Sequence, residues 1–385
     1  MRFAHLWSRS GSLTFAFALA GFASGANAES YTVLHRFAGA PDDGDRPSAG
    51  LRSDRAGNLY GTTRFGGSND YGTIFKVTPD GSEYLLHSFI GGKDQEYPIA
   101  GVIIDQKTGD LYGTVSGNNV ANCDGCGVIW KLTAQGRFSV LHTFEITDGS
   151  YPYGSMIRDT LGNLYGTTFY GGTSHNCTYG CGVVWKLAAD GAFSVLHNFT
   201  GSPDGAQPEG RLARDHAGNL YGTTAYGGYF DSSGGYGTIF KVASDGTETV
   251  LYSFTNGVDN RHPSSGVRRD KRGNLYGTTS WQLTSTVFRL APDGKLTTIS
   301  NLGADDPEGD LFLTHNSGRI YGTTYAGGAG TVYELTPNGV ESILHSFTDT
   351  EHPLAGVIKI KHTLYGTTAG GDGNDHGVVF GLTVR

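Results

Sequence analysis

The chain has 385 residues, 61 of them glycine, and its 36 acidic residues outnumber its 28 lysines and arginines, for a net charge of −8. An acidic chain without a basic stripe is a poor partner for nucleic acid or an anionic membrane surface, so we expect neither as a partner. The glycines are periodic and lie in turn-forming segments, which indicates a folded repeat protein rather than a disordered one.

Residues 1–28 have the composition of a secretory signal peptide. A start containing two arginines is followed by the apolar run Leu13–Ala23 and by the small-residue cleavage site Ala26–Ala28. The apolar run is too short to span a bilayer, and no later segment reaches that length. We therefore expect a secreted or periplasmic protein, with residues 29–385 forming one domain and no membrane span.

After the leader, four short phrases recur in a fixed order. LYGTT, or a close variant, is centred on tyrosines 44 to 56 residues apart: Tyr60, Tyr112, Tyr165, Tyr221, Tyr276, Tyr321 and Tyr365. Its companions have the forms YGTIFKV, VLHSF and GVIID. All four are rich in Val, Ile, Thr, Tyr or Phe and are bounded by Gly, Asp, Asn or Pro, which is typical of β-strands. This periodicity predicts a propeller, with a solenoid as the alternative.

We predict an all-β fold, a seven-bladed β-propeller of four-stranded antiparallel blades. From the axis outwards, the expected strand order is GVIID, LYGTT, TIFKV and VLHSF. The first strand, VLHRF (Val33–Phe37), has no blade before it, and the last blade lacks a VLHSF strand. Pairing the N-terminal strand with the last blade would close the ring and leave no free sheet edge, whereas a solenoid needs capping repeats.

The composite unit resembles a known family of tandem repeats. LYGTT-x-x-GG, followed by YGTIFKVTPDG and VLHSF, is similar to the GloVer repeat of exported "choice-of-anchor" proteins, and the resemblance spans residues 31–385. It implies export and a propeller-like repeat, and it implies no general catalytic activity.

The residues that recur in every repeat are interpreted as scaffold. The segment Asp215–Asn219 is a tight turn that several blades share, and the LYGTT tyrosines would fill the space between blades. The histidine of VLHSF lies in the outermost strand, where it would complete a hydrogen bond. We therefore look for function where the repeats differ.

The variable loops are expected on one face. In the predicted strand order, two kinds of loop lie on the same face of the propeller. They are the loops between the second and third strands of a blade and the loops that connect one blade to the next, and both are long and variable. The inter-blade loops carry the pattern Asp-x-x-x-Pro, and the residues beside the proline vary. We expect these residues to surround the mouth of the central channel: Arg46, Tyr97, Tyr151, Gln207, His262, Asp306 and His352 before the proline, and Tyr153, Glu209 and Glu308 after it.

We interpret this face as a non-catalytic binding site for a glycan or another surface polymer, presented by a monomeric scaffold. Aromatic rings stack on sugar faces, while carboxylates and amides bind hydroxyls. No familiar catalytic motif occurs in the sequence. The candidate ligand-binding residues are Tyr97, Tyr153, Tyr170, Tyr226, Tyr229 and Trp281.

Two alternative functions stay open. One is a polysaccharide-degrading enzyme with its site at the channel mouth: a lyase would need a base, an acid partner and a cation, and a glycoside hydrolase would need a carboxylate pair. The candidates for those roles are Tyr151, His262, His352, Arg46, Glu209 and Glu308. The other alternative is an envelope scaffold that binds proteins, although the divergence of the loops argues against it.

The four cysteines occupy the same loop position in two neighbouring repeats, as Cys123/Cys126 and Cys177/Cys181. In an exported protein we expect disulfides, formed within each loop or between the two loops. A four-thiolate zinc site shared by the loops is the alternative. Disulfides are favoured over zinc, and we predict no metal and no cofactor.

Overall fold

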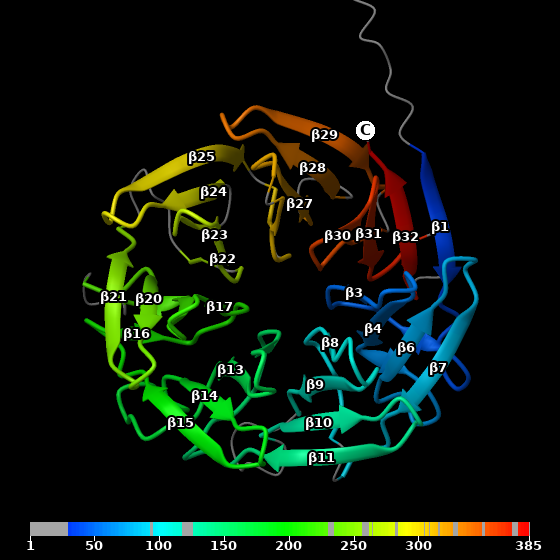
Figure 1. Cartoon of the computed structure of the whole chain (residues 1–385), viewed down its shortest axis with the longest axis horizontal. Coiled ribbons are helices and arrows are strands. Elements are labelled where there is room, and N and C mark those ends of the chain that lie inside the picture. Colours follow the sequence, from blue (N-terminus) through cyan, green and yellow to red (C-terminus); the bar gives the residue numbers. More distant parts are fainter. Residues whose placement is uncertain are drawn as a thin grey trace, which may run out of the picture.

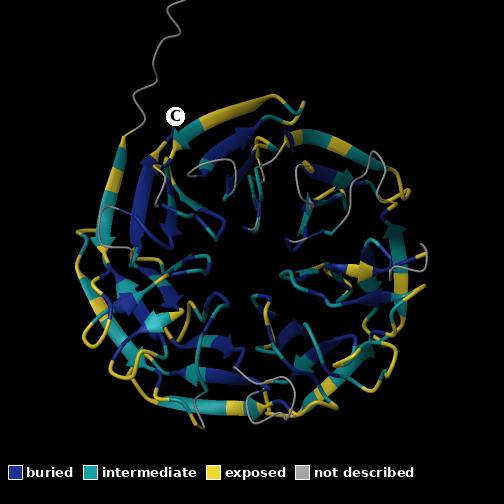
Figure 2. Ribbon diagram, turned by 180° about the vertical axis from the view of Figure 1, so that it is seen from behind, coloured by how far each residue is buried: buried dark blue, intermediate teal, exposed yellow. Residues whose placement is uncertain are grey.

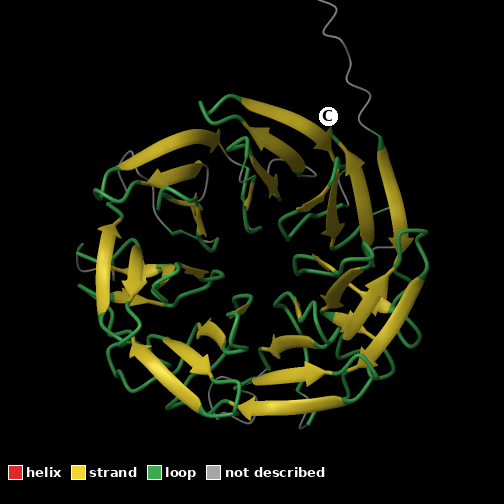
Figure 3. Cartoon of the chain, in the orientation of Figure 1, coloured by secondary structure: helices red, strands yellow, loops and turns green. Residues whose placement is uncertain are grey.

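The computed structural model describes residues 30–384 except 93–94, 118–125, 230–234, 256–261, 264, 282–283, 304, 308, 315, 326–329, 349–350 and 372–375. The predicted leader, Cys123, Glu308 and the side chain of Trp281 therefore lie outside the described parts. The described residues form strands and loops without a helix (Figure 3), which confirms the predicted all-β class. Within these residues, no helix is long and apolar enough to cross a membrane.

Seven four-stranded antiparallel sheets surround one axis (Figure 1). Blades 1 to 3 contain β3 (Arg52–Ser53), β4 (Leu59–Thr63), β6 (Thr73–Val77) and β7 (Glu83–Ser88); β8 (Ile103–Ile104), β9 (Leu111–Val115), β10 (Val128–Leu132) and β11 (Phe138–Thr143); and β12 (Ile157–Arg158), β13 (Leu164–Thr168), β14 (Val183–Leu187) and β15 (Phe193–Asn198). Blades 4 to 6 contain β17 (Ala213–Arg214), β18 (Leu220–Thr224), β20 (Thr238–Val242) and β21 (Glu248–Ser253); β22 (Arg268–Arg269), β23 (Leu275–Trp281), β24 (Thr284–Leu290) and β25 (Leu296–Gly303); and β26 (Phe312–Leu313), β27 (Ile320–Thr324), β28 (Thr331–Leu335) and β29 (Glu341–Ser346).

Blade 7 closes the ring. It combines β30 (Ile358–Ile360), β31 (Thr363–Thr368) and β32 (Val378–Thr383) from the C-terminal end with β1 (Tyr31–Arg36) from the N-terminal end. The β1 and β32 strands pair antiparallel, with Tyr31 opposite Leu382 and Arg36 opposite Val378. The predicted ring closure is confirmed, and the solenoid alternative is wrong.

The sheet order also matches the predicted order of phrases within a blade. Strands β3, β8, β17, β22 and β30 lie nearest the axis, and the strands with the VLHSF phrase lie on the outside (Figure 1). Among the strands, buried residues concentrate in the middle ones, and the outer strands carry most of the exposed strand residues; the turns and loops are also exposed (Figure 2). The hydrophobic core is divided into slices between neighbouring blades; Ile74 and Phe89 of blade 1, for example, pack with Leu111 and Trp130 of blade 2.

The LYGTT phrase is scaffold, as predicted. Its glycine lies directly under the aromatic ring of the adjacent strand, since a Cβ on Gly166 would approach Trp185 to 2.4 Å. Its tyrosine closes the preceding turn: Tyr165 donates its hydroxyl to Asp159 over 3.0 Å. The same carboxylate accepts the side-chain amide of Asn163 at 2.9 Å. Each turn of this type is therefore held by one acceptor with several donors.

Two small sheets connect the variable loops on one face. Strand β2 (Gly44–Asp45), in an inter-blade loop, pairs with β5 (Phe65–Gly66), which lies between the second and third strands of blade 1. Strand β16 (Gly205–Ala206) pairs in the same way with β19 (Tyr226–Gly227) in blade 4. The two kinds of long loop thus lie together, as the sequence predicts.

Candidate functional site

The inner strands enclose a central cavity of about 1010 Å³ to which all seven blades contribute residues. Tyr153 and Glu209, which follow the inter-blade prolines, line it on the side of the long loops. Asp159 and Asp215, at the turns after the inner strands, line it on the opposite side. The cavity therefore runs along the propeller axis.

The lining of this cavity is basic, although the chain as a whole is acidic. Seven arginines and four carboxylates belong to it: Arg52, Arg64, Arg158, Arg211, Arg214, Arg268 and Arg269, with Asp159, Glu209, Asp215 and Asp310. The cavity therefore attracts anions, whereas the net charge of the chain is −8.

Two of these arginines bridge neighbouring blades at the turn side of the cavity. Arg158 lies 5.7 Å from the ring centre of Tyr112 in blade 2 and 3.0 Å from the carboxylate of Asp105. Arg214 takes the same position over Tyr165 and lies 3.8 Å from Asp159. The charge of these arginines is balanced locally, so we assign them to the scaffold.

Three other arginines lie along the wall of the cavity with less compensation. Arg268 donates to Asp310 at 3.1 Å and to the carbonyl of Leu311 at 2.6 Å. Among the described residues Arg52 and Arg211 form no ion pair, and Nε of Arg211 is inaccessible and has no hydrogen-bond partner. We call these three guanidinium groups the arginine wall. Among the described residues, only that of Arg268 has a carboxylate partner.

The arginine wall is electrostatically strained. Burial, and after it the nearby charge of Arg268, lower the pKa of Arg52, and Asp310 offsets only part of this, so that the pKa is about 10. Arg52 and Arg268 belong to different blades, 1 and 5, so their charges meet across the interior of the ring. An anion bound between them would relieve the repulsion.

An aromatic platform adjoins the cavity at the long-loop face. It consists of Tyr151 and Tyr153 beside Pro152, and Phe169 and Tyr170 from the loop after β13. The rings of Tyr151 and Tyr153 stack at 6.1 Å, and Phe169 contacts Tyr170 edge-on at 4.5 Å. Tyr153 is 47% exposed and also lines the cavity. The structure thus brings three predicted site residues, Tyr151, Tyr153 and Tyr170, into one cluster next to the arginine wall.

The residues before the prolines have a backbone role that the sequence did not reveal. In blades 1 to 5 they adopt a left-handed conformation, with φ between 53° and 64°: Arg46, Tyr97, Tyr151, Gln207 and His262. In blade 3, Tyr151 donates its N–H to Cys126 of the preceding blade at 2.8 Å and accepts from Phe169 at 2.9 Å. The unusual φ therefore serves a backbone link between neighbouring blades.

The side chains of these residues pack on aromatic rings in the long loops. Arg46 lies 5.7 Å from the ring centre of Phe65, and Tyr97 contacts the same ring at 5.2 Å. His262 contacts Tyr226 at 4.5 Å. The cavity lining includes none of Arg46, Tyr97, Tyr151, His262 and His352, while it includes Tyr153 and Glu209.

The candidate catalytic residues are consequently spread over several loops. His352 packs on Tyr325 at 5.1 Å and precedes blade 7, whereas Arg46 precedes blade 1 and His262 precedes blade 5. Tyr229 is 72% exposed. Catalytic or binding roles for these residues stay predictions, as do those of Glu308 and Trp281, which lie outside the described residues or side chains.

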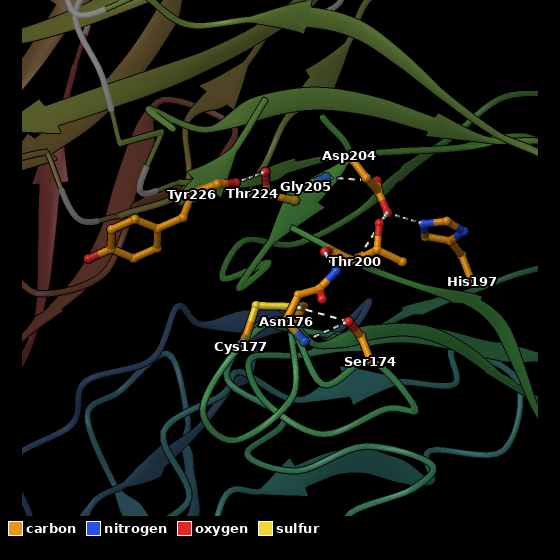
Figure 4. Close-up of a disulfide and its surroundings, with 10 residues drawn as sticks. Ser174, Asn176, Cys177, His197, Thr200, Asp204, Gly205, Thr224 and Tyr226 are labelled. Atoms are coloured by element: carbon orange, nitrogen blue, oxygen red, sulfur yellow. Dashed lines mark hydrogen bonds and ion pairs between the residues drawn. A yellow bond between two sulfur atoms is a disulfide. The ribbon is translucent and has the colours of Figure 1, made fainter. Parts of the chain in front are cut away.

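Cys177 and Cys181 form a disulfide within one loop of blade 3, with Cα atoms 5.2 Å apart (Figure 4). Cys126 is also disulfide-bonded. This confirms the predicted disulfide for the second loop, and it rules out for that loop both the inter-loop pairing and the zinc alternative. Asn176, in the same loop, donates to the carbonyl of Thr200 at 2.8 Å, which holds the loop against the next inter-blade segment (Figure 4).

The fold and the basic axial cavity define the chain as a seven-bladed repeat propeller with a charged central channel. The model of the Gloeobacter/Verrucomicrobia repeat matches residues 20–234, 125–328 and 229–385, so the chain belongs to this repeat family. The predicted family is thereby confirmed. Among curated proteins, none matches this chain in sequence.

Several solved propellers share the fold. The oligogalacturonate lyase of Vibrio parahaemolyticus has a TM-score of 0.58 at 11% identity, with 92% of this chain and 93% of that one covered. An oligogalacturonate lyase in complex with manganese has a TM-score of 0.57 at 10% identity, with the same coverage. At such identities the likeness shows the fold alone.

Proposed function

We propose that this protein is exported and binds an acidic carbohydrate polymer, without turning it over, at the long-loop mouth of its central cavity. The observation that carries this proposal is the arginine wall, a set of half-buried positive charges that line the cavity of an acidic chain. The aromatic platform next to it supplies the second part of the recognition.

The two features match the two parts of a uronate residue. The planar guanidinium group of arginine binds a carboxylate through two parallel hydrogen bonds, and it does so more strongly where water is scarce. The C–H faces of a sugar ring stack on aromatic side chains such as Tyr153. A carboxylated sugar that rests on the platform would direct its charge towards Arg52, Arg211 and Arg268.

The fold supports this choice of ligand indirectly. Two propellers with the same fold are named as oligogalacturonate lyases, so a ring of this kind accommodates an acidic glycan in those proteins. A chain of charged sugars can enter a cavity along the axis, whereas the surface of a folded protein partner would contact only its mouth. The envelope scaffold is therefore the weaker of the two binding hypotheses.

Calorimetric titration tests the proposal. We expect oligogalacturonate to bind, a neutral galactan oligomer of the same length to bind far more weakly, and added salt to weaken the acidic ligand because exposed charges are screened. Arg211→Met should lower the affinity about tenfold or more, since hydrogen bonds to a charged group contribute about 1.5–3 kcal/mol.

Arg137→Met is the matched control, because Arg137 is exposed in a turn between β10 and β11, away from the cavity. Equal affinity for the charged and neutral oligomers, or an unchanged affinity in Arg211→Met, would contradict the proposal. Incubation of the same acidic oligomer with the protein tests the lyase alternative. An increase in ultraviolet absorbance from unsaturated product would show that the protein cleaves the oligomer and does not only bind it.

A further inference from the structure

The outer strands of neighbouring blades meet in a regular way. The first residue of each outer strand packs near the fifth residue of the outer strand in the preceding blade, where the VLHSF phrase places histidine. At three such junctions the first residue is aromatic and its ring stacks on the histidine. Phe138 stacks on His87 at 4.0 Å, and Phe193 stacks on His142 at 3.7 Å. Tyr31 stacks on His345 at 4.2 Å.

At two other junctions that have the histidine, the first residue is glutamate instead. Glu83 of β7 faces His35 of β1 and Asp43 of the following loop, where blade 7 meets blade 1. Glu248 of β21 faces His197 of β15 and Asp204, where blade 3 meets blade 4. In each group the three potential ligand atoms lie within 4.8 Å of one another.

Each group contains a carboxylate oxygen that no described residue satisfies. In both glutamates, Oε1 is inaccessible to solvent and has no hydrogen-bond partner. A buried acceptor without a partner is costly, and here it lies beside a second carboxylate and an imidazole nitrogen. The stacked junctions avoid this cost, because an aromatic ring needs no partner.

We propose that each of these two junctions binds a divalent transition-metal ion such as Zn²⁺ or Mn²⁺. One imidazole nitrogen and two carboxylates are suitable ligands for such ions, and water would complete the coordination shell because the groups are only half-buried. The ion would neutralise the repulsion between the paired carboxylates and occupy the unsatisfied oxygen of the glutamate.

The aspartate at each junction is already fixed in place. Asp43 accepts the N–H of Ala38 at 2.8 Å and that of Gly44 at 2.6 Å, and its Oδ2 lies 3.2 Å from Nε2 of His35. Asp204 makes the equivalent contacts, with Gly205 at 2.7 Å and His197 at 3.2 Å (Figure 4). Hydrogen bonds that orient the ligands favour metal binding.

The location gives the ions a role in the ring. His35 belongs to β1, the strand that closes the propeller, and Glu83 belongs to the neighbouring blade, so an ion there joins the closing strand to blade 1. The second ion joins blades 3 and 4 in the same way. We therefore expect binding of the ions to raise the thermal unfolding temperature.

Titration of the metal-depleted protein with Zn²⁺ and with Mn²⁺, followed by calorimetry and native mass spectrometry, tests the proposal. We expect two ions per chain for at least one metal, one ion for Glu83→Phe, one for Glu248→Phe and none for the double variant. Phenylalanine is the residue that the chain itself uses beside His87 and His142, so both variants should fold.

Glu341→Gln is the matched control. Glu341 is also the first residue of an outer strand, but it accepts a hydrogen bond from Ser300 at 2.8 Å at a junction that has serine in place of histidine. This variant should still bind two ions. The proposal is overturned if the wild-type chain binds fewer than two ions with both metals, or if the double variant binds as many ions as the wild type.

Discussion

At the scale of single residues, the repeated aspartates explain why the turns after the inner strands are so regular. Burial alone would raise the pKa of Asp159, but hydrogen bonds from Asn163 and Tyr165 outweigh that effect and hold the pKa below its usual value. The aspartates of three other blades, Asp54, Asp215 and Asp270, show the same lowered pKa for the same reasons. The ionised carboxylate is thus part of the folded state.

These lowered pKa values predict acid sensitivity. A carboxyl group whose pKa is lower in the folded than in the unfolded state contributes its full stability above the unfolded pKa of about 4, and loses it as the pH falls through the folded value. We expect the free energy of unfolding, measured by urea denaturation between pH 7 and pH 3, to fall below about pH 4.

Asp159→Asn isolates the contribution of one turn. It should cost about 1–3 kcal/mol at pH 7, because partners of a buried carboxylate are left unsatisfied, and it should flatten the decline below pH 4. Asp190→Asn, in an exposed turn of the same blade, is the control. A variant with an unchanged acid profile would show that the turn aspartates do not set the acid limit.

The residues that form the candidate site were only partly predictable. Tyr151, Tyr153 and Tyr170 were selected from the variable loops, and they lie together. The positive φ before the prolines could not be predicted, because that position usually favours extended backbone; it turns Arg46 and His262 towards the loops. The arginine wall was missed because Arg52 and Arg268 interrupt a phrase interpreted as a plain apolar strand.

At the scale of strands and blades, the sequence predicted the strands, their order within a blade and the closure of the ring. Alternating apolar residues and glycine-rich turns specify strands locally, and seven repeats of four strands leave few arrangements that bury them all. The metal-binding groups show the limit of this reasoning. His35 and Glu83 belong to different repeats, and only the packing of neighbouring outer strands brings them together.

The closing strand β1 is the element on which the ring depends. Its removal would expose the edge of β32 that pairs with β1. It would also expose apolar residues of the core cluster against which Val33 packs, such as Phe347 and Phe380. We expect a chain that starts at residue 38 to unfold at a lower temperature than one that starts at residue 29, and to associate through the free edge. Thermal unfolding and size-exclusion chromatography measure both effects; identical behaviour of the two chains would show that β1 is dispensable.

At the scale of the whole molecule, the rigid ring holds charges that a less constrained chain would separate. Arg52 and Arg268 approach one another because blades 1 and 5 are fixed around the same axis, and the burial of Arg52 makes that proximity costly. The stability of seven stacked core slices offsets this cost. A group in a cavity whose pKa is strongly shifted by burial and a neighbouring charge is a candidate for a ligand-binding site.

A crystal structure of the protein with a bound uronate oligosaccharide tests the central claim most directly. The account predicts a sugar ring stacked on Tyr153 and a carboxylate within hydrogen-bond distance of the guanidinium group of Arg52 or Arg211. An oligosaccharide bound on another face, with the axial cavity left empty, would contradict it.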